Sequence, residues 1–421
     1  MHRRQFFASA AGAAAAFQND SAARAQSAAS SVAGRTADTV ARDEDFWFNI
    51  RHAFVVDRNL INLNNGGVSP SPKTVIDTET RLLEMENMTP TYYMWRILDP
   101  GVENVRRRLA RAFGCDPEEI AITRNASEAL ENVQFGLELK RGDEVITTNQ
   151  DYPRMISSWQ QREDRDGIVL KQITFPVPPP SMDDLTRRIE QAITPKTRVI
   201  LLNSPSNPTG AVFTAEEVAA IGALAKKHDL WIVSDEVYAT MVHEGHTFFS
   251  PFFDKALEER VIVCSSISKS HALPGFRAGW IAASSEFCER VLPVSETLLF
   301  GSPQFLQDAT AFALSHEFAE TENMRAHYVA RGRALIDGLA GSNRVSAHMP
   351  EGGMFVMVDV RRTGLSGEVF AFKLLREKGV VTMPGESFGA GGAGHLRVAL
   401  TVPETEMRMA AQRIAEVAAA V

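Results

Sequence analysis

The run Val-Ile-Val-Cys-Ser-Ser-Ile-Ser-Lys-Ser-His-Ala-Leu-Pro-Gly-Phe, residues 261–276, contains one lysine, Lys269, and no acidic residue. It opens as an apolar, β-rich segment, so Lys269 is expected just beyond the end of a buried strand. Burial without a salt-bridge partner lowers the pKa of an ammonium group, and the neutral amine attacks aldehydes to form a Schiff base. The stretch therefore predicts a reactive lysine at a strand end.

Similar apolar runs alternate with helix-like segments along the chain. The runs cover residues 144–147, 198–203, 230–233, 260–264 and 278–283. Ser181 and Thr214 each precede an acid by three positions, which is the pattern of a helix capping box. Continuous apolar strands of this length are buried on both faces, so we predict an α/β fold with a mainly parallel sheet flanked by helices.

Polar residues follow three of these runs. Asn207 lies in Asn-Pro-Thr-Gly, Asp235 and Tyr238 in Asp-Glu-Val-Tyr, and Lys269 in Ser-Ile-Ser-Lys. Ligands of open α/β sheets bind at the carboxyl ends of the strands. An amide, an acid with a phenol, and a lysine with hydroxyls are therefore expected on one rim.

The bulk composition limits the partners. The 421 residues carry a formal charge of −8, which argues against a nucleic-acid or anionic-membrane surface, because such surfaces need clustered Lys and Arg. The three cysteines have no close pair and no histidine at ligand spacing, so neither a disulfide framework nor a metal site is expected. Small molecules are the expected partners.

The first 25 residues read as a secretory signal. Arg3 and Arg4 precede Phe6 and an alanine-rich apolar run, which resembles the twin-arginine type of leader. The run is too short to span a bilayer stably. We expect a signal peptide at residues 1–25, a disordered linker at 26–42, and a periplasmic or secreted protein, or a cytoplasmic one if the leader does not function.

The segment at residues 266–280 resembles the lysine segment of class I and II aminotransferases of pyridoxal-5'-phosphate (PLP) fold type I. A hydroxyl, a lysine, a Pro-Gly turn and an arginine keep the family order and spacing. The resemblance implies that Lys269 binds the cofactor as a Schiff base and moves protons. It also implies that Ser266, Ser268 and Arg277 hold the phosphate, since a guanidinium forks onto phosphate oxygens.

Other motifs extend the resemblance to the cofactor ring. Asp235 would keep the pyridine nitrogen protonated, which makes the ring an electron sink. Tyr238 and Asn207 would meet the ring 3'-oxygen, and Tyr152 falls where the family places a stacking aromatic. Residues 123–130 follow an apolar run and open a helix, whose first residues Ala126 and Ser127 would cradle phosphate.

The motifs expected to bind the substrate resemble two different classes, class V and class I. Residues 64–70, Asn-Asn-Gly-Gly-Val-Ser-Pro, resemble the N-terminal loop of class V, epimerase-like members, with Gly67 near the substrate carboxylate. Arg397 in His-Leu-Arg would clamp the α-carboxylate, together with Asn207, as in class I. Tyr92 and Tyr93 lie near the position of a tyrosine that crosses the dimer, but the spacing leaves that assignment open.

The resemblance implies a large PLP-binding domain at residues 91–300 with a mainly parallel seven-stranded sheet. It also implies a smaller α/β domain from residues 43–90 and 301–421, and a homodimer. The expected reaction is transfer of an amino group from an α-amino acid to a 2-oxo acid. Racemisation or epimerisation, a lyase reaction, and a non-catalytic PLP-binding protein are the alternatives, and the sequence does not identify the amino acid.

Overall fold

The computed structural model describes residues 30–36, 39–40, 43, 45–46, 48, 61–64, 66, 80, 83–98, 100–178, 181–257, 259–299, 310, 314 and 319–421. They fall into two units, one within residues 1–58 and 69–93 and the other within 59–68 and 94–421. The predicted signal peptide lies outside the described residues. In the described part of the chain, no helix is long and apolar enough to cross a membrane.

The first unit contributes the short helix α5 (Pro90–Tyr92), which starts with a proline at its first turn. Proline suits that position because its φ is fixed near the helical value and its missing N–H has no helical partner. Tyr92 and Tyr93 contact edge to face, with ring centroids 5.5 Å apart. All site residues discussed below belong to the second unit.

A seven-stranded sheet dominates the second unit. Its strand order is β2-β8-β7-β6-β5-β3-β4. The strands are β2 (Ile120–Thr123), β3 (Glu144–Thr148), β4 (Val169–Ile173), β5 (Thr197–Asn203), β6 (Trp231–Asp235), β7 (Val261–Ser266) and β8 (Gly279–Ala282). The neighbours from β4 to β7 pair in parallel, as predicted, whereas β8 runs antiparallel to both β7 and β2.

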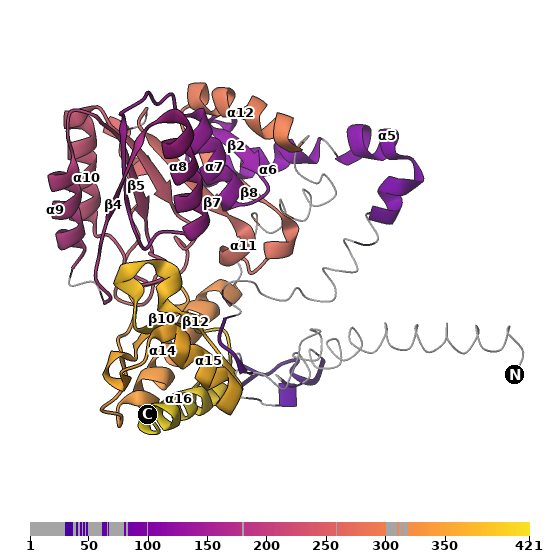
Figure 1. Cartoon of the computed structure of the whole chain (residues 1–421). Helices are drawn as coiled ribbons and strands as arrows, with labels where there is room; N and C mark the ends of the chain where they lie inside the picture. The colour runs from indigo at the N-terminus through magenta and orange to yellow at the C-terminus, as the bar shows by residue number, and fades with distance from the viewer. Residues whose placement is uncertain are drawn as a thin grey trace, which may run out of the picture. The chain divides into compact units, whose positions relative to one another are not determined.

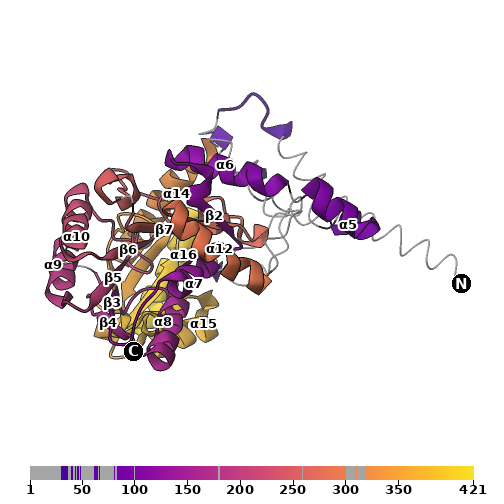
Figure 2. The ribbon, with the colours of Figure 1, turned by 90° about the horizontal axis from the view of Figure 1, so that it is seen from above.

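Helices cover both faces of this sheet. One face packs against α7 (Ala126–Gly136), α8 (Pro153–Asp166) and α12 (Ser285–Leu299), around the fully buried Trp159. Helices α9 (Met182–Ala192) and α10 (Ala215–His228) lie on the opposite side of the sheet from α7 and α8, as Figures 1 and 2 show. Helix α6 (Gly101–Phe113) precedes β2. Burial on both faces explains why these strands are continuous apolar runs.

The helix starts follow the predicted capping chemistry. The Ser181 side chain accepts a hydrogen bond from the backbone N–H of Asp184 at the start of α9. Thr214 does the same for Glu217 at the start of α10, and the Glu217 side chain returns the bond to complete a capping box. Both caps satisfy N–H groups that a first helical turn leaves without a partner.

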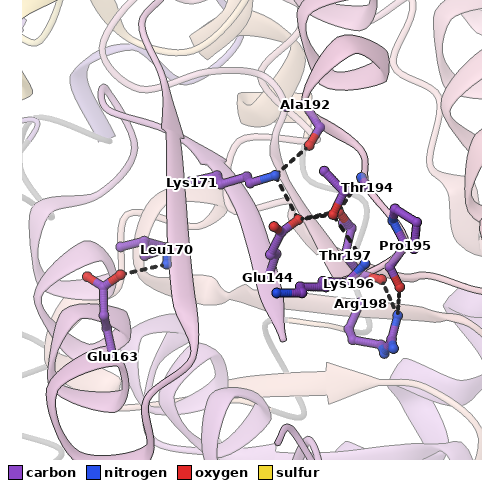
Figure 3. A network of polar contacts seen from close by, with 10 residues as sticks. All are labelled: Glu144, Glu163, Leu170, Lys171, Ala192, Thr194, Pro195, Lys196, Thr197 and Arg198. Atoms are coloured by element: carbon purple, nitrogen blue, oxygen red, sulfur yellow. Dashed lines mark hydrogen bonds and ion pairs between the residues drawn. The ribbon is translucent and has the colours of Figure 1, made fainter. Parts of the chain in front are cut away.

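A polar network joins β3, β4 and β5 near the amino ends of β3 and β5 (Figure 3). The Glu144 carboxylate accepts from Thr194 and Thr197 hydroxyls at 2.6 and 2.9 Å, and pairs with Lys171 Nζ at 2.7 Å. Burial alone would raise the pKa of Glu144, but these hydrogen bonds outweigh it and lower the pKa. The network thus links neighbouring strands through a buried carboxylate, whose Oε2 atom makes all three contacts.

Smaller sheets and C-terminal helices complete the second unit. A four-stranded sheet has the order β12-β13-β10-β9, and β1 pairs with β11 in parallel. The strands are β1 (Ile61–Asn62), β9 (Ser346–Ala347), β10 (Phe355–Asp359), β11 (Val380–Val381), β12 (Met383–Pro384) and β13 (His395–Ala399). The helices are α14 (Ala319–Leu339), α15 (Gly367–Lys378) and α16 (Glu404–Ala419). Apolar side chains from most of these elements pack into one core, and Figure 1 shows the helices α14, α15 and α16 beside β10 and β12.

Candidate active site

Three adjacent strands end at one rim of the large sheet. In the parallel register, Asn203 at the end of β5 lies opposite Asp235 at the end of β6, and Asp235 lies opposite Cys264 in β7. Strand β7 ends at Ser266, where the short helix α11 (Ile267–Ser270) begins and carries Lys269. Asn207, the predicted amide, follows β5, and its backbone N–H donates to Asn203 Oδ1 at 2.9 Å. The acid and the lysine thus lie at the carboxyl ends of neighbouring strands, and the amide lies next to Asn203.

Asp235 is a buried acid with neutral hydrogen-bond partners. Its carboxylate accepts from the backbone N–H of Val237 at 3.2 Å and from Asn203 Nδ2 at 3.4 Å. Burial raises its pKa to about 7, and the negative charge of Asp151 adds to this rise. A positively charged group next to this carboxylate would hold it ionised.

Lys269 is a half-buried amine with a lowered pKa. Its Nζ donates to the backbone carbonyl of Gly66 at 2.7 Å. Burial lowers the pKa of this amine to about 8, helped by the positive charge of Arg397. A substantial neutral fraction near neutral pH is what a nucleophilic amine requires.

The start of α7 forms one side of the predicted anion site. Asn125 caps the helix by accepting from the backbone N–H of Glu128 at 2.9 Å, which leaves Ala126 and Ser127 in the first turn. Gly279 in β8 lies directly behind this turn. A Cβ built on Gly279 would lie 2.6 Å from the Asn125 backbone, so only glycine lets the strand approach so closely.

The lysine segment forms the other side. Ser266 is only 2% exposed and caps α11 by accepting from the backbone N–H of Ser268 at 3.4 Å. Arg277 has a left-handed backbone, with φ of 49°, and its Nη1 donates to the carbonyl of Pro274 at 2.5 Å. Burial and the nearby Arg124 lower the pKa of Arg277, an effect that a bound phosphate would offset.

Two tyrosines extend the site. Tyr152 precedes α8, and its hydroxyl accepts from Ser127 Oγ at 3.4 Å, which connects the predicted ring-stacking residue to the anion site. Tyr238 is buried, packs edge to face on Phe355 with ring centroids 5.9 Å apart, and has a pKa raised by burial. Tyr238 is therefore a neutral phenol, able to donate a hydrogen bond.

Arg397 from β13 is enclosed by neutral groups. Its Nη1 donates to Asn207 Oδ1 at 3.0 Å and its Nη2 to Asn64 Oδ1 at 3.1 Å. The guanidinium carbon lies 4.0 Å from the ring centroid of Phe355 and 4.7 Å from that of Phe388. Burial lowers the pKa of Arg397 to about 10, and Nε has no hydrogen-bond partner among the described residues. A bound anion would compensate the positive charge of this buried guanidinium.

Not every predicted residue can be placed. Gly67 lies outside the described residues, and Tyr92 and Tyr93 belong to the first unit. The sequence reasoning missed Asn64 as a partner of Arg397 and Asn125 as the cap of α7. It also missed the contacts of the Phe355 and Phe388 rings with the guanidinium. Asn125 was detectable as an asparagine before a helix start, whereas the other contacts join distant segments.

PLP fits this set of residues. Asp235 is a buried acid that a pyridinium nitrogen would match, Arg277 and the α7 turn suit a phosphate, and Lys269 is an amine suited to an aldehyde. Burial raises the pKa of Asp235 and lowers that of Arg277, and a bound group of opposite charge would offset both shifts. Burial also lowers the pKa of Lys269, which favours the neutral amine that attacks a carbonyl. The donor set therefore matches the cofactor that the sequence implied.

Known proteins resemble the chain over most of its length. The family model "Aminotransferase class I and II" matches residues 65–414. An arginine–pyruvate transaminase from Pseudomonas aeruginosa is 38% identical over 320 residues, covering 75% of this chain and 78% of that protein. An aspartate/prephenate aminotransferase from Thermus thermophilus is 32% identical over 75% of this chain and 81% of its own length. An aromatic aminotransferase structure from Pyrococcus horikoshii has a TM-score of 0.73 at 25% identity, covering 86% of this chain and 96% of that one.

Proposed function

Because this chain belongs to the class I and II aminotransferases and is a PLP-dependent transferase of amino groups, we propose that Lys269, Asp235 and Arg397 carry its reaction. The observation that supports this most is the Lys269 amine. Its pKa is lowered to about 8 by burial and by Arg397, the residue that would hold the substrate carboxylate. The proton carrier and the substrate anchor are thus electrostatically coupled.

The proposed cofactor contacts divide between the phosphate and the pyridine ring. Ala126, Ser127, Ser266, Ser268 and Arg277 hold the phosphate. The ring contacts come from Asp235 at the nitrogen, Tyr238 and Asn207 at the 3'-oxygen, and Tyr152 on the ring face. When bound, the cofactor supplies an electron sink for the charge left on the α-carbon after its proton departs.

The protein residues then orient the substrate and move one proton. Arg397 binds the α-carboxylate through its guanidinium, and this contact decides which α-bond faces the cofactor. Lys269 Nζ, as a neutral amine, takes the α-proton and returns it to a different carbon. Asp235 stays ionised beside the ring nitrogen and keeps that nitrogen protonated.

L-Arginine and pyruvate are the first donor and acceptor to test, because a relative at 38% identity is an arginine–pyruvate transaminase. The purified, cofactor-loaded protein is mixed with single amino acids and no oxo acid. We expect about one equivalent of 2-oxo acid per site, and pyruvate added afterwards yields alanine. Solvent deuterium at the α-carbon without oxo acid would instead indicate racemisation, and ammonia release would indicate a lyase. Lys269→Ala is the control, expected to bind cofactor without turnover.

We also infer a homodimer and export through the leader. Light scattering on the loaded enzyme is expected to give twice the 46.3 kDa chain mass, less the leader if it has been removed. Cell fractionation is expected to place the protein outside the cytoplasm, and replacement of Arg3 and Arg4 by lysine should retain it inside. A monomeric mass or an unchanged distribution would contradict the respective inference.

A further inference from the structure

Arg397 has an unusual set of partners for a buried cation. Its exposed fraction is only 6%, yet the acceptors that the described residues offer it are the amide oxygens of Asn64 and Asn207. Arginine only donates hydrogen bonds, so the oxygen of each amide must face the guanidinium. Amide oxygens orient the cation without neutralising its charge.

The backbone holds Asn64 firmly in this position. Its neighbour Leu63 is fully buried, receives a hydrogen bond from Ala399 N at 2.7 Å, and donates to Val381 O at 3.0 Å. The Asn62 side chain accepts from Asn64 N at 2.9 Å. Asn64 thus extends from a segment bonded on both sides to the small sheets, including the strand that carries Arg397.

The same segment reaches the other cation of the site. Two residues beyond Asn64, the Gly66 carbonyl accepts from Lys269 Nζ at 2.7 Å. A Cβ on Gly66 would lie 2.6 Å from the Phe355 ring that packs on Arg397. One short segment therefore contacts both the lysine and the arginine of the site.

We infer that Asn64 is a positioning residue that fixes the Arg397 guanidinium for the substrate α-carboxylate while leaving its positive charge uncompensated. The inference rests on the proposed function, in which Arg397 binds that carboxylate. An aspartate at position 64 would be nearly the same size and would still accept from Nη2. It would also pair with the charge that the substrate needs, and so compete with the substrate.

A charge-preserving role and a purely structural role of Asn64 predict different orders of activity among its variants. If Asn64 only anchored the arginine, Asn64→Asp would behave like the wild type and Asn64→Ala would be worse. If the uncompensated charge matters, Asn64→Asp is the more damaging change even though the hydrogen bond survives. Asn64→Ala removes the hydrogen bond that orients Arg397 but leaves the positive charge of Arg397 uncompensated, so we expect an intermediate effect.

The test uses the loaded enzyme and 2-methylalanine, which has an α-carboxylate but no α-proton and is bound without turnover. The dissociation constant is read from the cofactor absorbance. We expect it to rise roughly 10-fold in Asn64→Ala and roughly 100-fold in Asn64→Asp, the range of one hydrogen bond to a charged group. Asn343→Asp, which adds the same charge at an exposed residue outside the site, is expected to leave binding unchanged.

Turnover provides the second measurement. With the best amino acid from the donor screen, KM is expected to rise in parallel with the dissociation constant while kcat changes less than about threefold. Wild-type affinity for 2-methylalanine in either Asn64 variant overturns the inference. A fall in kcat as large as the rise in KM overturns it as well. Asn64→Ser replaces any variant that fails to fold. If the proposed function is wrong, the wild-type enzyme itself releases no 2-oxo acid, and this outcome is distinct from a failure of the Asn64 inference.

Discussion

Two buried charges of the site, those of Asp235 and Arg397, have neutral hydrogen-bond partners. Asp235 accepts from an amide and a backbone N–H, and Arg397 donates to two amides. Burying a charge without an opposite charge is unfavourable, and the shifted pKa values of these two groups express that cost. In the proposed function, the ring nitrogen of the cofactor and the substrate carboxylate would supply the opposite charges.

The Lys269 amine makes a prediction about pH. Below its pKa of about 8 the amine is protonated and does not attack an aldehyde, whereas above it the amine is neutral. The rate at which cofactor-free protein captures PLP is therefore expected to rise about tenfold per pH unit and level off above about 8. Arg397→Gln removes the repelling charge and should move this midpoint upward, toward the ordinary lysine value. An unchanged midpoint, measured by stopped-flow absorbance, would contradict the coupling.

At the scale of elements, the phosphate side of the site depends on how closely β8 approaches the first turn of α7. Gly279→Ala introduces a Cβ 2.6 Å from the Asn125 backbone and 2.9 Å from the carbonyl of Ser265. Both contacts are with backbone, so the helix start must shift. We expect a loss of about 1–3 kcal/mol in unfolding free energy and a clear loss of cofactor affinity.

The matched control for this change is Gly341→Ala. A Cβ there meets nothing within 4 Å, and its backbone is not left-handed. Denaturant unfolding and PLP titration of both variants make the comparison. Equal stability and equal PLP affinity in the two variants would show that the close approach at Gly279 is not required.

The Glu144 network makes a second prediction at this scale. Its lowered pKa means that its contribution to stability is present above the unfolded value near 4.5 and is lost as pH falls through the folded pKa. Glu144→Gln is expected to cost roughly 1–3 kcal/mol at pH 7. In denaturant unfolding the wild type and the variant should converge in acid, while the exposed Glu289→Gln should show no such trend. A difference in unfolding free energy between wild type and Glu144→Gln that is the same at every pH would contradict this role of Glu144.

At the scale of the whole molecule, the site collects residues from most of the second unit. Its contacts come from β5, β6, β7, α7 and β13 and from the segment beside β1. Because PLP would bind groups that only the folded chain brings together, it stabilises the native state by mass action. At 100 times its dissociation constant the gain is expected to be about 2.7 kcal/mol. Thermal unfolding with and without PLP measures it, and Lys269→Ala should show a smaller gain.

Local features of the fold were predictable from local sequence. The caps at Ser181 and Thr214 were confirmed because a cap depends on residues three positions apart. The apolar runs were found within about two residues of their ends because a buried strand has to be apolar throughout. The edge strand β4 was missed, since Lys171 and Gln172 interrupt its apolar run and none of its residues, including the exposed Val169, is fully buried. The antiparallel direction of β8 was also beyond reach, because composition carries no strand direction.

Short motifs and strand periodicity were enough to predict the fold class, the cofactor and the sheet edge at which Asp235 and Lys269 lie. The groups that each charge contacts depend instead on how the chain packs. Arg397 and Asn64 are 333 positions apart, and Lys269 and Gly66 are 203 apart. Their contacts, and the pKa shifts that follow, arise from burial and distance, which exist only once the chain has packed.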